Sequence, residues 1–228
     1  MQNDFVLRKI VKKFPRLYYF LVVVFGPIYF SGLNPKKFLS KYDQSGVKLN
    51  LGSGPKKIGA DVLNVDIHPY IGVDIVSDIH LLPLENDSVS MIVCDTVLEH
   101  VLEPEKVISE MYRVLKIGGL CYISTPFLYP YHPSPHDYTR WTSQGLDHLV
   151  NNFTIVEKGV RCGIASTFSV NLSYFFATLF CFGSEKAFGL LVDLSLILFF
   201  PIKFLDIVLN KFSFSKYTAS VLYIVARK

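Results

Sequence analysis

Short apolar runs separated by polar turns dominate the chain from residue 47 to about residue 160. Six of these runs predict strands: VKLNL, VLNVD, VDIVS, SMIVCD, CYIST and FTIVEKGV. Their near-continuous hydrophobicity is typical of parallel strands that are covered on both faces. Between the fourth and fifth runs, PEKVISEMYRVLKIGG predicts a helix that Gly118-Gly119 ends. Its apolar face consists of Val107, Ile108, Met111, Val114 and Leu115. This order of strand, helix and strand predicts an α/β domain.

A long apolar stretch interrupts this pattern after Arg161. No residue from Cys162 to Ser184 is charged, and AFGLLVDLSLILFFPIKFLDIVL follows soon after. Within this second run, Asp193 and Lys203 leave too few residues between them to cross a bilayer. We therefore expect two amphipathic or re-entrant helices over residues 162–212 that lie in a membrane interface. Because ASVLYIVARK adds a further β-rich run, the insertion separates the last two strands of the sheet.

The first 44 residues differ from the rest of the chain. The basic hexamer RKIVKK precedes LYYFLVVVFGPIYF, which is uncharged but interrupted by Gly26-Pro27. The apolar run is shorter than the roughly 20 residues of a membrane span, and the cleavage pattern of a signal peptide is missing. We expect a helix on the membrane surface or partly inserted, with a true span or a buried core helix as alternatives. The predicted organisation is a membrane-associating segment over 1–44 and a sheet domain over 45–228.

Composition favours a membrane partner over nucleic acid. Half of the residues are hydrophobic and 18% are charged, against a usual charged share of about 25%. The net charge is +4, and basic groups lie near both ends of the chain. The middle of the sequence contains no stripe of basic residues interleaved with aromatic residues, which nucleic-acid binding would favour. Basic groups beside an apolar run suit an anionic membrane surface. The four cysteines form no CxxC pair, which favours reduced thiols. We therefore expect the cytoplasmic face of a membrane.

Glycines and carboxylates follow the predicted strands at the points where ligands bind. The carboxyl ends of parallel strands share one edge of an open α/β sheet, and ligands collect there. The candidate residues are Gly52, Ser53, Gly54, Asp66, Asp78 and Asp95. Glycines allow a ligand to approach the backbone, and a carboxylate such as Asp66 can accept hydrogen bonds from both hydroxyls of a ribose. Lys57 stands where a dinucleotide fingerprint would need its third glycine, so a nucleoside fits better than a pyrophosphate.

The order LNLGSGP, NVDIH, SDIHLLPLENDS, CDTVLEHV, EMYRVLKIGG, YISTPF resembles class I S-adenosylmethionine-dependent methyltransferases. It is most similar to a branch with a hydrophobic insertion near the C-terminus. The resemblance implies a Rossmann-like, seven-stranded, mostly parallel sheet whose last strand, ASVLYIVARK, is antiparallel. It also implies S-adenosylmethionine as cofactor. The cofactor-binding residues that it implies are Gly52, Ser53, Gly54, Asp66, Ile67, Asp78, Ile79 and Asp95.

Two positions depart from the family's pattern. Asn50 stands where the first strand commonly ends in Asp, and Ser90 replaces the Asp that usually precedes the fourth strand. These departures keep open a membrane-bound binding or scaffold protein that retains the fold without turnover. An NAD-dependent oxidoreductase is a further alternative, because Tyr112-x-x-x-Lys116 has the spacing of short-chain dehydrogenases. That pair is expected after the fifth strand, however, and here precedes it.

The loop YHPSPHDYTRWT follows the fifth predicted strand on the ligand edge. His132 and His136 are four residues apart, but the two intervening prolines exclude the helix that would align them on a metal, so we predict no metal site. One interpretation is that the loop covers an acceptor pocket, with His132 or His136 as general base and Asp137 orienting it. The other is a rigid turn in which Asp137 pairs with Arg140.

The predicted function is methyl transfer from S-adenosylmethionine to a hydroxyl of a saccharide or lipid-linked acceptor at the membrane. A hydroxyl acceptor must lose a proton, which a histidine of near-neutral pKa can take. The predicted apolar insertion motivates the membrane-bound acceptor. His100 is expected to be structural, and the oligomeric state is left open.

Overall fold

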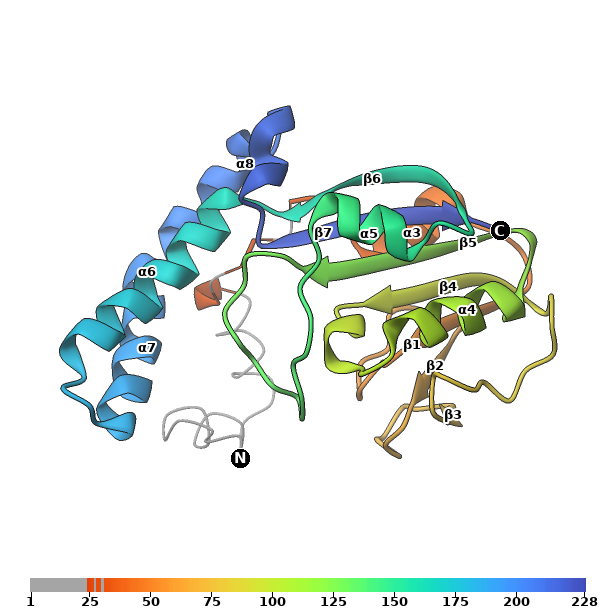
Figure 1. The fold of residues 1–228 in the computed structure, drawn as a ribbon, viewed down its shortest axis with the longest axis horizontal. Helices are drawn as coiled ribbons and strands as arrows, with labels where there is room; N and C mark the ends of the chain where they lie inside the picture. Colours follow the sequence, from red (N-terminus) through yellow and green to blue (C-terminus); the bar gives the residue numbers. More distant parts are fainter. Residues whose placement is uncertain (1–23, 27, 30) are drawn as a thin grey trace. The chain divides into compact units, whose positions relative to one another are not determined.

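The computed structural model describes residues 24–26, 28–29 and 31–228, and it contains a seven-stranded sheet (Figure 1). The strand order is β3-β2-β1-β4-β5-β7-β6. The strands are β1 (Val47–Leu51), β2 (Val62–Asp66), β3 (Ile75–Val76), β4 (Val89–Asp95), β5 (Leu115–Pro126), β6 (Thr154–Cys162) and β7 (Val221–Arg227). Neighbouring strands from β3 to β5 are parallel, and β7 is antiparallel to β5. The predicted fold class is therefore confirmed.

Of the described helices, the first precedes β1 and the others lie between later strands. The α-helices are α3 (Pro35–Tyr42), α4 (Pro104–Val114), α5 (Ser143–Leu149), α6 (Ile164–Phe180), α7 (Glu185–Phe199) and α8 (Asp206–Leu209). The 3₁₀ turns are η1 (Leu98–His100), η2 (Phe200–Leu205) and η3 (Ser213–Tyr217). The helices from α6 to α8 lie in sequence between β6 and β7, which confirms the predicted apolar helices between the last two strands.

The end of α4 differs from the prediction. We expected the helix to continue to Gly118-Gly119, but it ends at Val114 and β5 begins at Leu115. Leu115 pairs with Val89 of β4, so its backbone joins the sheet instead of extending the helix. Gly118 has a φ of +82°, and it lies where the pairing register between β4 and β5 shifts.

The chain divides into two compact units. The sheet unit comprises residues 32–127, 136–161 and 221–228, and the helical unit comprises residues 128–135 and 162–220 with the described residues before Gly32. In the sheet unit, Phe38 of α3 packs in a buried cluster with Met91, Tyr122 and Val225. The rings of Phe38 and Tyr122 lie 5.6 Å apart. Large apolar side chains thus form the core of the sheet unit, as the strand pattern predicted.

Two buried charges organise the helical unit. The Asp206 carboxylate accepts hydrogen bonds from the backbone N–H groups of Gly163, Ala165 and Ser166, at the N-terminus of α6. A carboxylate is favourable there because the first N–H groups of a helix have no partner within the helix. The Lys203 ammonium donates to the carbonyl oxygens of Val24 and Gly26 at 2.9 and 2.6 Å.

The N-terminal prediction falls largely outside the described residues. RKIVKK lies entirely outside them, and of the apolar run only residues 24–26 and 28–29 are described. In the described part of the chain, one helical stretch, Glu185–Leu209, is long and apolar enough by length and composition to cross a membrane. The shorter α6 is also apolar. Whether these helices cross a membrane or lie in its interface stays a prediction.

Candidate cofactor and active site

The turn after β1 brings the backbone close to the carboxyl edge of the sheet. Gly52 and Gly54 have φ values of +60° and +54°, a region that strongly favours glycine. A side chain on Gly52 would place its Cβ 2.6 Å from the Val97 methyl groups. Nothing lies within 4 Å of the position that a Gly54 Cβ would take. The turn is therefore tightly packed on one side and open on the other, so a ligand can approach its backbone.

Asp66 ends β2 and contacts the same turn. Its Oδ2 accepts a hydrogen bond from the Gly54 N–H at 2.8 Å, and its Oδ1 accepts one from the His68 N–H at 2.9 Å. A carboxylate has about four acceptor positions, so each oxygen can still accept a ligand hydroxyl. Ser53 N–H donates to the Val65 carbonyl at 3.1 Å, which joins the turn to β2. Gly52, Ser53, Gly54 and Asp66 thus form one connected turn whose chemistry fits a ribose and the backbone of an amino-acid moiety.

The second carboxylate, Asp78, follows β3. Asp78 Oδ1 accepts a hydrogen bond from the His80 N–H at 2.9 Å, which lowers the pKa of this half-exposed carboxyl and keeps it charged. Ser77 N–H donates to the Asp66 carbonyl, so the segment before Asp78 is held at the end of β2. Of the two flanking apolar residues, Ile79 is buried and Ile67 is 61% exposed. The side chain of Ile67 is therefore available for an apolar contact with a ligand, whereas that of Ile79 is not.

Asp95 ends β4 and is paired inside the protein. Arg161 at the end of β6 donates from both terminal nitrogens to the Asp95 carboxylate and from Nη1 to Ser124 Oγ at 2.9 Å. Ser124 Oγ also donates to Asp95 Oδ1 at 2.5 Å. The guanidinium and the carboxylate therefore neutralise each other at the ligand edge, with three strands meeting at one polar network. Any contact between Asp95 and a cofactor would share the carboxylate with Arg161.

The two departures from the family's pattern have structural partners. Asn50 donates from Nδ2 to Asn64 Oδ1 at 3.0 Å, and Asn64 in turn donates to the Gly72 carbonyl at 2.9 Å. This buried pair of amides holds the loops that follow β1 and β2. Ser90 Oγ donates to the Ser45 carbonyl at 2.8 Å. Although neither Asn50 nor Ser90 has a carboxylate, the side chains of both residues form hydrogen bonds that support the loops and strands around the site.

Glu99 in the LEHV element is a buried titratable group that the sequence analysis did not single out. Its side chain has no exposed surface, and Oε1 lies 3.7 Å from His100 Nε2. Burial raises the pKa of the Glu99 carboxyl to about 8, and the nearby Arg140 partly opposes that shift. The sequence signal was its place in CDTVLEHV, the segment that also contains Asp95. A carboxyl with a pKa near neutrality can exchange a proton under physiological conditions.

Backbone contacts join LEHV to the later part of the loop. The Tyr138 N–H donates to the Glu99 carbonyl at 2.7 Å, and His100 Nδ1 donates to the His136 carbonyl at 2.6 Å. This contact agrees with a structural role for His100, which also lies next to Glu99. The Asp137 carboxylate pairs with Arg140, whose Nη2 donates to Oδ2 at 2.7 Å. This contact agrees with the rigid-turn interpretation for Asp137, and its role in orienting a histidine stays a prediction.

The two predicted bases belong to different units. His136 lies in the sheet unit, where its ring is tilted against Tyr138 at 5.4 Å. His132 lies in the helical unit, where Nδ1 donates to the Pro130 carbonyl at 3.0 Å and the ring contacts Tyr129 at 5.0 Å. Thr142 caps the following helix, α5, by accepting a hydrogen bond from the Gly145 N–H at 3.1 Å. The structure leaves both histidines as candidates for the base.

Comparison with known sequence families identifies the central part of the sheet unit. Residues 53–123 match the family described as a methyltransferase domain. This segment of the chain is similar to a methyltransferase domain. The match runs from the glycine turn to β5 and includes Asp66, Asp78, Asp95 and the LEHV element. The match confirms the predicted methyltransferase class and agrees with S-adenosylmethionine as the methyl donor.

Similar proteins agree on the fold. A methyltransferase from Archaeoglobus fulgidus, described as SAM-dependent, shares 16% identity at a TM-score of 0.53 and covers 92% of this chain and 99% of its own. An N1-methyltransferase for 1,6-didemethyltoxoflavin from Burkholderia thailandensis, solved with S-adenosylhomocysteine, shares 13% identity at a TM-score of 0.52 over 83% of this chain and 74% of its own. The [4+2]-cyclase SpnF matches with 14% identity at a TM-score of 0.52, over 85% of this chain and 79% of its own. The fold is therefore shared by proteins with different reactions.

One curated relative is more similar in sequence. It is described as an uncharacterized 37.1 kDa protein in a transposon of Streptomyces fradiae, and it is 32% identical over 108 residues. The match covers 45% of this chain and 30% of the relative. This chain thus matches under a third of that relative's length.

Proposed function

We propose that this protein transfers a methyl group from S-adenosylmethionine to a hydroxyl of a saccharide or lipid-linked acceptor at a membrane. The observation that carries the proposal is the connected turn of Gly52, Ser53, Gly54 and Asp66, inside the segment that matches a methyltransferase domain. The turn is open at Gly54 and bears one carboxylate whose oxygens can accept ribose hydroxyls. S-adenosylmethionine supplies an activated methyl group on a sulfonium with a neutral thioether leaving group.

The protein's part in this reaction is to align the acceptor and to take its proton. Alignment accounts for much of the rate when the leaving group is already good. The proton of an acceptor hydroxyl requires a base with a pKa near the working pH. His132 and His136 both remain candidates from the loop, and Glu99 joins them because burial raises the pKa of its carboxyl to about 8. The fixed Asp137–Arg140 pair and the backbone contacts to LEHV hold this part of the loop in place.

A membrane-bound acceptor is favoured by the apolar character of the helical unit, where several large side chains on α6 and α7 are exposed. We favour a hydroxyl as the acceptor group because the candidate site contains titratable groups that can take its proton. An amine or thiol acceptor would have less need of such a base. In this proposal the cytoplasmic face of the membrane is the site of action, in agreement with the reduced, largely buried cysteines.

The first test compares two glycines that share a left-handed backbone. Gly52 and Gly118 have φ values of +60° and +82°, but only a Cβ at Gly52 would clash with Val97. We expect Gly52→Ala to weaken equilibrium binding of S-adenosylmethionine to the detergent-solubilised protein by about tenfold or more, and Gly118→Ala to leave it unchanged. Equal binding by both variants would place the cofactor elsewhere, and binding of NAD in place of S-adenosylmethionine would favour the oxidoreductase.

The second test is turnover. Membranes that contain the wild-type protein are incubated with S-adenosylmethionine carrying an isotopic label in the methyl group, and extracted lipids and glycolipids are then analysed for the label. We expect labelled product with wild type and with Gly118→Ala, and loss of the product with Gly52→Ala. Cofactor binding without any labelled product in these fractions would favour a scaffold protein or a different acceptor.

A further inference from the structure

The α6–α7 hairpin has small and polar side chains inside and large apolar side chains outside. The buried residues of α6 are Ala165, Ser166, Thr167, Ser169, Val170, Ser173 and Ala177, and those of α7 are Gly189, Val192 and Ser195. The hydroxyl groups of this inner seam are satisfied within the unit. Ser169 Oγ donates to the Phe199 carbonyl at 2.9 Å, and Ser173 Oγ donates to the Ser169 carbonyl at 2.9 Å.

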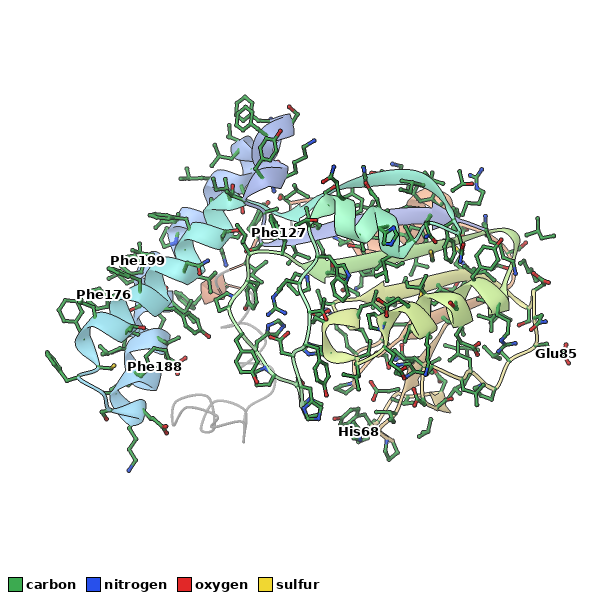
Figure 2. All side chains as sticks on the ribbon, in the orientation of Figure 1. His68, Glu85, Phe127, Phe176, Phe188 and Phe199 are labelled. Atoms are coloured by element: carbon green, nitrogen blue, oxygen red, sulfur yellow. The ribbon has the colours of Figure 1, made fainter. Side chains whose placement is uncertain are left out.

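Exposed apolar residues recur at helical spacing along the outer faces of α6 and α7. On α6 the exposed apolar positions are Ile164, Phe168, Phe175 and Leu179, and on α7 they are Leu190, Leu194, Ile197 and Leu198. Phe175 is 65% exposed, and Phe182 in the turn between the helices is 91% exposed. Figure 2 labels Phe176, Phe188 and Phe199 on the two helices, and the ring centroids of Phe176 on α6 and Phe199 on α7 lie 6.2 Å apart. Large apolar side chains therefore cover the outer faces of both helices.

This arrangement is the reverse of a water-soluble helical hairpin. In water, burial of a Phe or Leu side chain stabilises a protein by about 1.5–3 kcal/mol, so such side chains belong inside. In a bilayer that driving force is absent, and helices associate through small residues and interhelical hydrogen bonds while apolar side chains contact lipid. The small inner seam and the apolar outer faces both match the second environment. A soluble protein partner would explain the outer faces but not the polar seam.

A segment rich in aromatic and basic residues follows the hairpin in the same unit. Its exposed members are Lys211, Phe212, Phe214, Lys216 and Tyr217. The rings of Phe212 and Phe214 are stacked at 5.2 Å, and the Lys216 ammonium lies 5.7 Å from the centre of the Tyr217 ring. Lysine and aromatic side chains of this kind concentrate at the headgroup level of membranes, and the lysines attract anionic lipids.

We infer that the outer faces of α6 and α7 contact the acyl chains of an anionic phospholipid bilayer, with Lys211–Tyr217 at the headgroup level. Of the three charged residues between Lys186 and Lys211, Asp193 is half-buried on α7, and the other two agree with this placement. Lys203 and Asp206 are buried and hydrogen-bonded within the unit, so they do not face lipid. Glu185 and Lys186, at the turn between the helices, are exposed and would lie at a polar surface. The inference names the membrane partner and stands independently of methyl transfer.

The test is flotation of the full-length protein with vesicles of phosphatidylcholine alone or mixed with phosphatidylglycerol. The outer-face variant carries Phe168→Ser, Phe175→Ser and Leu190→Ser, and the matched control carries Ile71→Ser and Ile117→Ser on the sheet unit, where both isoleucines are at least 87% exposed. We expect wild type and control to float with the mixed vesicles and the outer-face variant to bind about tenfold more weakly or worse. Lys211→Ala with Lys216→Ala should weaken binding to the mixed vesicles only.

Several results would overturn the inference. One is wild-type protein that stays unbound with both kinds of vesicle, and another is an outer-face variant that floats as well as the control. Self-association of wild type without vesicle binding, abolished in the outer-face variant, would assign the faces to a second copy of the chain. S-adenosylmethionine binding is measured on the same samples. Retained cofactor binding in a variant that no longer floats would show that the domain is folded and that the membrane contact alone is lost.

Discussion

The sheet unit and the helical unit use their apolar residues in opposite ways. In the sheet unit, Leu49, Met91 and Ile123 are completely buried. In the helical unit, Phe168 and Phe175 are more than half exposed while Ser166 and Ser173 are completely buried. Both units are rich in apolar residues, so composition alone does not distinguish them. Hydrophobic content therefore indicates that a segment requires apolar surroundings, but it does not say which. In the sheet unit the protein's own core surrounds the apolar side chains, and in the helical unit we propose that lipid does.

Buried charges follow a common rule in both units. In the sheet unit, Arg161 is paired with Asp95 across strands. In the helical unit, Asp206 accepts backbone hydrogen bonds and Lys203 donates to backbone carbonyls. A buried charge without such partners would cost several kcal/mol or lose its charge. Glu99 is the buried carboxyl in which burial dominates, and its pKa is raised for that reason.

Glu99 gives the largest expected effect. Its pKa rises from 4.5 to about 8 on folding, so between these values the folded protein keeps a proton that the unfolded chain releases. The stabilising contribution is complete below pH 4.5 and is lost as the pH rises through about 8, by up to about 5 kcal/mol. Thermal unfolding in detergent should show the Tm of wild type falling over this range relative to Glu99→Gln, which cannot release a proton. Parallel curves for the two proteins would mean that Glu99 is ionised in the fold.

Truncation of one large apolar side chain in each unit compares the two environments directly. Met91→Ala removes a completely buried side chain and should lower the free energy of unfolding by about 3 kcal/mol. Phe175→Ala removes a larger but mostly exposed side chain and should change it by less than about 0.5 kcal/mol. Chemical denaturation in the same detergent, followed by circular dichroism, measures both values. Similar losses for the two variants would show that Phe175 is packed against protein, which would erase the contrast between the units.

The inner seam predicts a smaller effect within one helix. Ser173→Leu places a large side chain where α6 meets its neighbours and should destabilise the helical unit by about 1–3 kcal/mol through overpacking. Thr178→Leu makes a similar change at an exposed position of α6 and should stay within about 0.5 kcal/mol of wild type. The Tm of each variant in detergent distinguishes them. A Ser173→Leu variant more stable than wild type would mean that the seam is loosely packed and has room for a larger apolar side chain.

The local pattern of the sequence determined much of the sheet unit. The apolar runs predicted the strands, the glycine and carboxylate positions predicted one ligand edge, and the insertion between the last two strands was visible from composition. These features are local, because strand pattern and turn chemistry depend on neighbouring residues. The predicted C-terminal end of α4 was wrong because the pairing of Leu115 with Val89 overrides the helical periodicity of the segment.

Only the tertiary structure decided which distant groups meet and which face of a helix is inside. Arg161 and Asp95 are 66 positions apart, and no local pattern pairs them. Glu99 could be recognised as part of LEHV, but its complete burial and its raised pKa depend on the surrounding fold. The periodicity of α6 defines a face of Ser and Ala and a face of Phe and Leu, and a rule derived from water would turn the second face inward. The structure turns it outward, since the small face allows closer helix packing and the apolar face is left for its surroundings.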